Sequence, residues 1–211
     1  PEGCWATIEL RGGTEIEKVI LHHAGAEVGQ GSHTAFCQMA AESVGVDIEK
    51  VELIASDTST SDNSGSVSAS RMTFMSGNAI IGAGKLALEK WRNEERPAIA
   101  KYFYKAPKTT PFDKETGECN PNISYGYVAE AVETEVDLET GEVHITNIIC
   151  VDDVGKAINP QLVIGQIEGC IVQAAGYGLM ENFIQENGYV KTSQLSTYLI
   201  PTVLDIPDRI Q

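Results

Sequence analysis

The sequence has few positive charges. Its 211 residues include 15 Lys and Arg against 30 Asp and Glu, which gives a formal net charge of −15. Because nucleic acids and anionic membrane surfaces are bound by basic surfaces, this balance argues strongly against both partners. An acidic surface by itself indicates solubility and names no partner.

Cysteines are few and scattered, and long apolar runs are missing. The five cysteines (Cys4, Cys37, Cys119, Cys150 and Cys170) are odd in number, widely spaced and without a CxxC pair. We therefore expect reduced, buried thiols in a cytoplasmic protein and no zinc site. No apolar run approaches the ~20 residues that span a bilayer, and no basic-then-apolar leader indicates secretion.

Both ends of the sequence suggest a piece of a longer polypeptide. Pro1 leads almost directly into a strand-like run without a start methionine, and the last residues, up to Gln211, form neither a helix pattern nor a polar tail. We therefore expect chain on both sides of these residues.

The remaining pattern predicts an α+β fold with mixed β-sheets and packed helices, as one domain over residues 1–211 or as two interleaved lobes. The expected helices cover residues 32–44 and 72–91, and a third begins at Asn159-Pro160. Strands are expected at 4–10, 15–23, 51–55, 98–104, 123–138 and 143–151, with hairpin turns at 139–142 and at Asn187-Gly188.

A glycine-rich segment, GAEVGQGSHT at residues 25–34, is the first candidate site. Its glycines bracket Gln30, so the backbone could approach a ligand closely and offer N–H groups. The helix expected next, with Ser32 as its N-cap, would add a dipole that favours an anion. The alternative is an ordinary turn with Gln30 and His33 at the surface. The segment matches neither a GxGxxG motif nor a P-loop.

The second candidate is DTSTSDNSGSVSAS at residues 57–70, which precedes the second helix. Long loops pinned between a strand and a helix are commonly functional. Small hydroxyl residues before a helix N-terminus suit an anionic or oxo-rich ligand. Alternatively, Asp57 and Asp62 cap turns.

The third candidate, IGQIEGCIVQAAG at residues 164–176, has the composition of a buried helix that carries Gln166, Glu168 and Gln173. Burying such groups without partners costs about 1–3 kcal/mol, so each should bond to backbone or to a polar ligand. Glu168 could be an acid or base with a raised pKa, but we favour a role in holding an adjacent loop.

The histidines form no pattern of this kind. His22 and His23 alternate along a strand and should face opposite sides, which argues against a shared metal.

The three segments occur in the order and at the distances found in the molybdenum hydroxylases, the family of xanthine dehydrogenase and aldehyde oxidase, which the chain resembles over almost its whole length. The resemblance is carried by GAEVGQGSHT at 25–34, SVSASRMTFMSGNAI at 66–80, DDVGKAINPQLVIGQIEGCIVQAAGYGLMEN at 152–182 and STYLIPTVLDIP at 196–207.

The resemblance implies a fragment from the second half of a molybdopterin-binding domain and assigns cofactor contacts. Gln30 would bond near the dithiolene and metal end of molybdopterin, and Gln166 would bond to the pterin. The full implied set is Gly29, Gln30, Gly31, Ser68, Ala69, Ser70 and Gln166. The cofactor is molybdopterin, with its cytosine dinucleotide form as one option.

The resemblance also implies an oxidoreductase that hydroxylates a carbon of a heterocycle or an aldehyde. In this family the glutamate base lies beyond the segment that matches Ile206-Pro207, so we expect no catalytic residue and no metal ligand within 1–211, and an inactive isolated fragment. Iron–sulfur and flavin subunits or domains would be its partners in a cytoplasmic oligomer that acts on a small molecule. Two alternatives remain: a non-catalytic relative whose loops build a subunit interface, and a protein that only binds or matures the pterin.

Overall fold

The computed structural model describes residues 3–68, 70–207 and 209–211, and it divides into two compact units. The first unit runs to Ile123 and the second begins at Ser124. Both contain strands and helices, which confirms the predicted α+β class.

A four-stranded sheet in the order β3-β2-β1-β4 forms the first unit. The central strand β1 pairs antiparallel with β2 and β4, whereas β2 and β3 run parallel. The strands are β1 (Gly3–Gly12), β2 (Ile16–His23), β3 (Val51–Ala55) and β4 (Ala98–Lys105).

Alternate side chains of the sheet form the core of this unit. Ile8 and Leu10 on β1, and Val19 and Leu21 on β2, are completely buried. Glu9 and Ile20, which lie between them, are also buried, at 8% and 4% exposed, so neither side of these strand segments is open to solvent.

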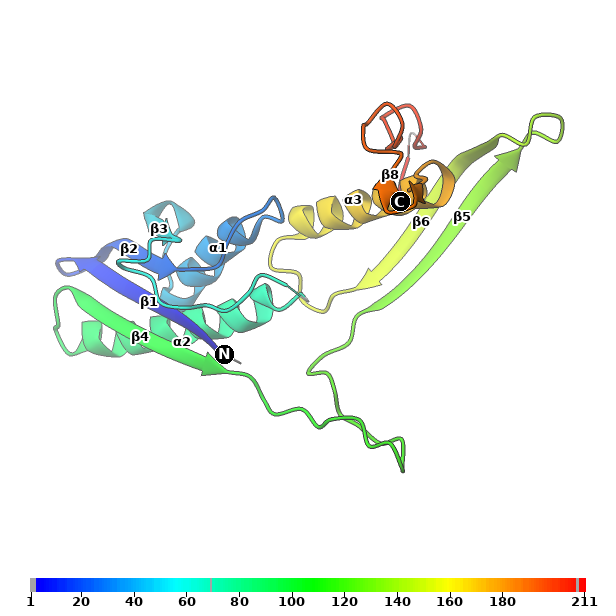
Figure 1. The fold of residues 1–211 in the computed structure, drawn as a ribbon. Helices are drawn as coiled ribbons and strands as arrows, with labels where there is room; N and C mark the ends of the chain where they lie inside the picture. Colours follow the sequence, from blue (N-terminus) through cyan, green and yellow to red (C-terminus); the bar gives the residue numbers. More distant parts are fainter. Residues whose placement is uncertain (1–2, 69, 208) are drawn as a thin grey trace. The chain divides into compact units, whose positions relative to one another are not determined.

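Helices α1 (Ser32–Val44) and α2 (Met72–Arg92) pack against the sheet and against each other (Figure 1). A Cβ on Gly77 would lie 2.8 Å from Met39 Sδ, and one on Gly84 would lie 2.2 Å from Ser43 Oγ. The later residue of α2, Gly84, thus faces the later residue of α1, Ser43. The two helices therefore run in the same direction and begin at the same end of the unit.

The end of α1 follows the sequence prediction. Gly45 adopts φ 74°, and its N–H donates to Ala41 O at 2.9 Å, which closes the helix. A short 3₁₀ helix (Ile48–Lys50) then leads into β3. That strand was expected to be buried, but it lies at the sheet edge and is half-buried.

The second unit contains a long hairpin and one long helix. Asn159 Oδ1 accepts the N–H of Leu162 at 3.1 Å and Pro160 is the first helical residue, which confirms the predicted start of α3. The hairpin at Asn187-Gly188 is also confirmed. The elements are β5 (Tyr127–Val136), β6 (Val143–Asp153), α3 (Pro160–Leu179), β7 (Gln185–Glu186) and β8 (Tyr189–Val190).

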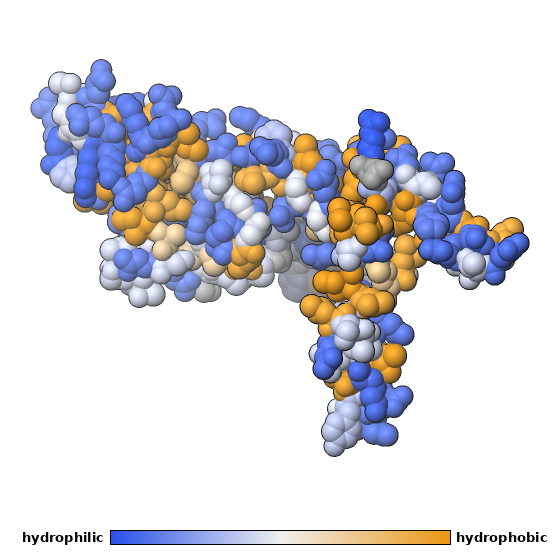
Figure 2. Space-filling view, turned by 90° about the horizontal axis from the view of Figure 1, so that it is seen from above, coloured by the Kyte–Doolittle hydropathy of each residue, from blue (hydrophilic) through white to orange (hydrophobic). Residues whose placement is uncertain are grey.

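The second unit has almost no hydrophobic core among its described residues. Ile148 and Ile171 are its buried hydrophobic side chains, and all ten residues of β5 are exposed. Hydrophobic side chains, orange in Figure 2, lie exposed over this part of the surface.

The prediction that α3 is buried is wrong for this chain. Gln166, Glu168 and Gln173 are all exposed, and only Ile171 and Gly176 of the helix are buried. Its composition indicates a helix that packs against other chain, but the described residues do not supply that packing.

The prediction that no segment reaches the length of a membrane span also needs correction. The 20 residues of α3 are long and apolar enough to cross a bilayer, by length and composition only. A single helix of this kind is weak evidence. Glu168 lies near its middle, and a charge at the bilayer centre costs about 2.5–3.5 kcal/mol, so the sequence favours packing against protein.

The cysteines are free, but they are less buried than predicted. Cys4 is buried, Cys37 and Cys150 are half-buried, and Cys119 and Cys170 are exposed.

Candidate functional site

The glycine-rich loop (residues 24–31) and the serine-rich loop (residues 56–71) begin at the same end of the first sheet, where β2 and β3 end. β2 and β3 are parallel and end side by side, with His23 paired to Ala55, and the N–H of Ser56 donates to His23 O at 3.0 Å. Residues 24–31 follow β2 and residues 56–71 follow β3. Ligands bind preferentially at the carboxyl ends of parallel strands, so this end of the sheet is the candidate site.

Arg71 anchors the serine-rich loop at the start of α2. Its guanidinium donates to Ser64 O at 2.9 Å and to Ser66 O at 2.8 Å, and also reaches Gly3 O at 3.4 Å. The loop is therefore fastened both to α2 and to the first residue of β1.

Glu27 occupies the place predicted for a bound anion at the start of α1. Its carboxylate accepts the N–H groups of Gly29 and Gly31, each at 2.9 Å, and of His33 at 3.0 Å. The predicted N-cap is thus corrected: Gly31 is the cap residue, at φ 80°, and the Ser32 side chain makes no cap bond. The glycine N–H groups that were expected to face a ligand are already engaged.

These bonds also set the ionisation of Glu27. Burial alone would raise the pKa of this carboxyl, but the N–H donors of His33, Gly31 and Gly29 outweigh burial and lower the pKa to about 2. Glu27 therefore stays charged at neutral pH and complements the N-terminal end of α1.

Gln30 is held within its own loop. Its Nε2 donates to Ala26 O and to Ser32 Oγ, both at 2.9 Å, and its Oε1 accepts the N–H of Val28 at 2.7 Å. A ligand could use the second lone pair of Oε1 without displacing these bonds. The alternative of an ordinary turn with Gln30 at the surface is therefore too simple, because Gln30 organises the loop.

A buried polar group lies beneath the glycine-rich loop. His23 is 1% exposed and His22 is half-buried, which fits the predicted opposite orientation of the two rings. His23 Nδ1 accepts the N–H of Gly25 at 2.8 Å, and its Nε2 lies 3.4 Å from Cys4 Sγ. Sequence reasoning missed this contact, although alternation along β2 already placed His23 on the core face.

The serine-rich loop presents hydroxyl groups. Ser66 and Ser68 share a hydrogen bond of 2.9 Å at the surface, and Ser70 is exposed at φ 54°. Within the described ranges, the hydroxyls of Ser61 and Ser64 are buried without a hydrogen-bond partner. Unpaired buried hydroxyls are costly, so this loop has polar capacity for a ligand or ordered water. The predicted contact Ala69 lies outside the described residues.

The structure thus brings Gly29, Gln30, Gly31, Ser68 and Ser70 to the same end of the first unit, where α1 and α2 both begin (Figure 1). The remaining predicted contact, Gln166, belongs to α3 of the second unit and is exposed.

Glu168 shows neither of its predicted roles. It is exposed on α3, and among the described residues it makes no hydrogen bond to a neighbouring loop.

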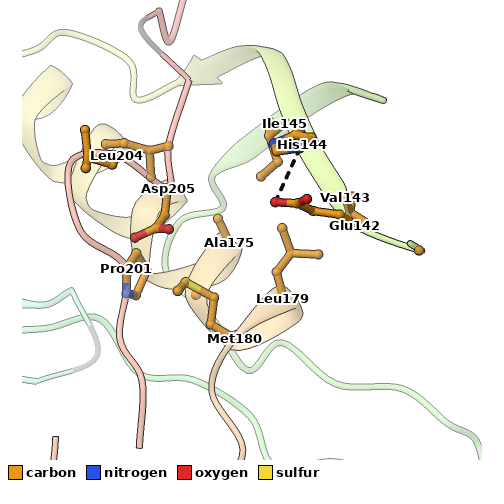
Figure 3. A pocket seen from close by; sticks show the side chains of 13 residues that line it. Glu142, Val143, His144, Ile145, Ala175, Leu179, Met180, Pro201, Leu204 and Asp205 are labelled. Atoms are coloured by element: carbon orange, nitrogen blue, oxygen red, sulfur yellow. Dashed lines mark ion pairs between the residues drawn. The ribbon is translucent and has the colours of Figure 1, made fainter. Parts of the chain in front are cut away.

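A separate hollow of about 460 Å³ lies within the second unit (Figure 3). It is formed by the start of β6, the end of α3 and residues 201–206, and both polar and apolar groups line it. Glu142 and His144 pair at 3.5 Å on one side, and Asp205 lies on the other, where it is bonded to Thr202. No predicted contact residue lines it, and sequence reasoning gave no signal for it.

A family model described as "Molybdopterin cofactor-binding domain" matches residues 2–98 and 85–207. The chain belongs to this family. The family assignment agrees with the resemblance to the molybdenum hydroxylases found in the sequence.

The relatives of this molybdopterin-domain chain are much longer proteins. Xanthine dehydrogenase/oxidase of Mus musculus is 31% identical over 209 residues, which cover 90% of this chain but 16% of the relative. Xanthine dehydrogenase of Dictyostelium discoideum is 28% identical over a similar share.

Solved structures extend the comparison to the fold. The crystal structure of the aldehyde oxidoreductase from Desulfovibrio desulfuricans superposes with a TM-score of 0.85 at 28% identity, and the match covers 100% of this chain and 24% of that protein. The corresponding structure from Desulfovibrio gigas gives the same TM-score at 26% identity. The chain thus spans a minor part of the proteins it matches.

Proposed function

We propose that this chain is part of the molybdenum-binding subunit of a xanthine dehydrogenase-like oxidoreductase that hydroxylates a carbon of a heterocycle or an aldehyde. The observation that carries the proposal is the convergence of the Gln30 loop and the serine-rich loop at the carboxyl ends of β2 and β3. Family membership and the xanthine dehydrogenase relatives support it.

The residues at the carboxyl ends of β2 and β3 suit molybdopterin. The proposed contacts are amides, hydroxyls and backbone groups, which carry no charge of their own and can bind a polar group. The negative charge beside them comes from Glu27, which already accepts the N–H groups of Gly29 and Gly31. The unpaired hydroxyls of Ser61 and Ser64 show that the serine-rich loop has unused polar capacity. The proposed contacts are Gly29, Gln30, Gly31, Ser68, Ala69, Ser70 and, from the second unit, Gln166.

When bound, the cofactor would supply the redox chemistry, and the protein would supply binding and orientation. Gln30 would accept a hydrogen bond from the cofactor through the free lone pair of Oε1. Glu27 would keep the loop in shape and Arg71 would hold the serine-rich loop against β1. The proton-accepting glutamate of this reaction would come from elsewhere in the full polypeptide.

Further features of the intact protein belong to the same proposal. The cofactor could be the cytosine dinucleotide form of molybdopterin, and electrons would pass to iron–sulfur and flavin subunits or domains. The complex would be an oligomer in the cytoplasm. In this setting the two units would act as parts of one cofactor-binding domain.

Two other functions compete with this proposal. The exposed hydrophobic side chains of the second unit favour a non-catalytic relative in which this region only builds a subunit interface. A protein that binds or matures the pterin without oxidising a substrate would use the same two loops.

Metal and pterin analysis of the purified full-length complex tests the proposal. We expect molybdenum and pterin in equal amounts, together with oxidation of an aldehyde or a heterocycle by an artificial electron acceptor. Pterin without any such oxidation would support the maturation protein. A folded complex that takes up neither molybdenum nor pterin would contradict the proposal and support the interface protein.

A further inference from the structure

The backbone of Gly25, near the start of the glycine-rich loop, is held on both sides of its Cα. Its N–H donates to His23 Nδ1 at 2.8 Å, and its C=O accepts from His33 Nε2 at 2.8 Å. One histidine comes from the end of β2 and the other from the first turn of α1. The two rings therefore fasten the loop to both elements that flank it.

The partners decide whether one nitrogen of each ring carries a hydrogen. A backbone N–H can only donate, so His23 Nδ1 carries no hydrogen and the neutral ring carries it on Nε2, which faces Cys4 Sγ at 3.4 Å. A carbonyl can only accept, so His33 carries a hydrogen on Nε2. Each ring is therefore committed to one orientation.

The packing around Gly25 leaves no room for a side chain at this position. A Cβ at Gly25 would lie 2.9 Å from the His23 ring and 3.0 Å from Phe36. The Phe36 ring lies 4.6 Å from the His23 ring and 6.1 Å from the His33 ring, measured between centroids. Both histidines are thus braced by one buried aromatic ring.

We propose that His23 and His33 are positioning residues that fix the Gln30 loop in the shape that receives the cofactor. The link to Gln30 is short, because Gln30 Nε2 bonds to Ala26 O, in the residue next to Gly25. A shift at Gly25 would move Ala26 and then the Gln30 amide. The proposal rests on the proposed function, since it names what orients one of its contacts.

The test uses the full-length enzyme and four variants. His23→Leu removes the acceptor for the Gly25 N–H, and His23→Asn keeps one, because the Asn Oδ1 takes the place of Nδ1. His33→Ala removes the second bond at a half-buried position without opening the core. His22→Leu is the matched control, because His22 lies on the opposite face of the same strand.

Two quantities are measured: amide hydrogen exchange over residues 24–34, and the pterin retained after gel filtration. We expect His23→Leu and His33→Ala each to speed exchange and to lower pterin retention about fivefold, as the loss of one typical hydrogen bond predicts. His23→Asn should keep most of the exchange protection and of the pterin retention of the parent, and His22→Leu should equal the parent in both quantities.

The outcomes separate the two proposals. Unchanged exchange, or faster exchange with full pterin retention, would overturn the positioning role and leave the proposed function standing. If His23→Leu does not fold, His33→Ala and His23→Asn decide the question. A parent enzyme without pterin would overturn the proposed function, and the positioning role would fall with it.

Discussion

Two buried or hydrogen-bonded side chains, His23 and Glu27, make the glycine-rich loop sensitive to acid in two different pH ranges. Burial, together with the smaller effect of the nearby His33, lowers the pKa of His23 to about 4. Glu27 is shifted by its three N–H donors to a pKa of about 2. Both groups keep the loop in place in the ionisation states they hold at neutral pH.

The loop should loosen in two steps as the pH falls. His23 is neutral in the folded protein, so its contribution is complete above its ordinary pKa of 6.5 and is lost as the pH falls toward 4. This step is worth no more than about 3 kcal/mol. The stabilisation by Glu27 is complete above its ordinary pKa of 4.5 and is lost only as the pH falls toward 2.

Hydrogen exchange over residues 24–34, expressed as protection relative to the intrinsic rate at each pH, measures both steps. We expect His23→Asn to abolish the step between pH 6.5 and 4, because an amide does not titrate, and to leave the step at lower pH intact. A parent loop whose protection is constant from pH 7 to 4 would contradict the assignment to His23.

Gln166 is exposed on α3, so its substitution should affect the cofactor more than folding. We expect Gln166→Ala in the intact enzyme to lower the molybdenum and pterin content while the thermal midpoint stays within about 1 °C, as is usual for surface substitutions. Gln161→Ala, at an exposed position in the first turn of the same helix, is the control. Equal molybdenum content in the Gln166→Ala variant and the parent would count against the predicted contact.

At residue level, the sequence predicted features that depend on near neighbours in the chain, but not contacts between residues that are far apart in the chain. The Asn159 cap, Pro160 and the Gly45 stop depend on neighbours within one turn, and all three were found as predicted. The roles of Glu27 and His23 depend on how the loop folds back over α1 and β2, which no spacing rule specifies.

The contact between α1 and α2 fixes the common end at which both loops lie. Two glycines of α2 face α1, but their surroundings differ. Gly84 faces Ser43, whose Oγ and Cβ lie 2.2 and 2.8 Å from the position of an added Cβ, whereas Gly77 faces the flexible thioether of Met39. The two positions therefore respond differently to an added methyl group.

We expect Gly84→Ala to destabilise the protein by about 1–3 kcal/mol, because the helices would have to separate. Gly77→Ala should be close to neutral, since Met39 can shift and Ala gains about 1 kcal/mol over Gly within a helix. Thermal unfolding of the two variants in the full-length protein measures the difference. Equal destabilisation by both would show that the helices do not meet at Gly84 as described.

At element level, the sequence located the helices and the main strands but not what covers them. The spacing of the apolar residues and the Asn159-Pro160 pair specify where α3 begins, and its small apolar side chains indicate that the helix packs against other protein. They cannot indicate which surface packs against it, and within this chain the helix is exposed. The parallel pairing of β2 with β3, which brings the two loops together, also depends on long-range contacts.

The two units differ in how much of their stability they can supply themselves. The first buries nearly all of the hydrophobic core, including Phe36, Ile80 and Trp91, beneath a four-stranded sheet. In the described part of the second, Ile148 and Ile171 are buried, and its main sheet is a two-stranded hairpin. An isolated hairpin is marginal in water, so the second unit should depend on contacts with other protein surfaces.

We therefore expect residues 1–123, expressed alone, to unfold cooperatively on heating, and residues 124–211 alone to show no cooperative transition. Circular dichroism during heating and the dispersion of amide NMR signals measure both. Ile148→Ala in the isolated second unit serves as the control, because it should change nothing if no core exists there. A cooperative transition of residues 124–211 that Ile148→Ala weakens would contradict this expectation, since a core around Ile148 would then stabilise the unit without help from the rest of the protein.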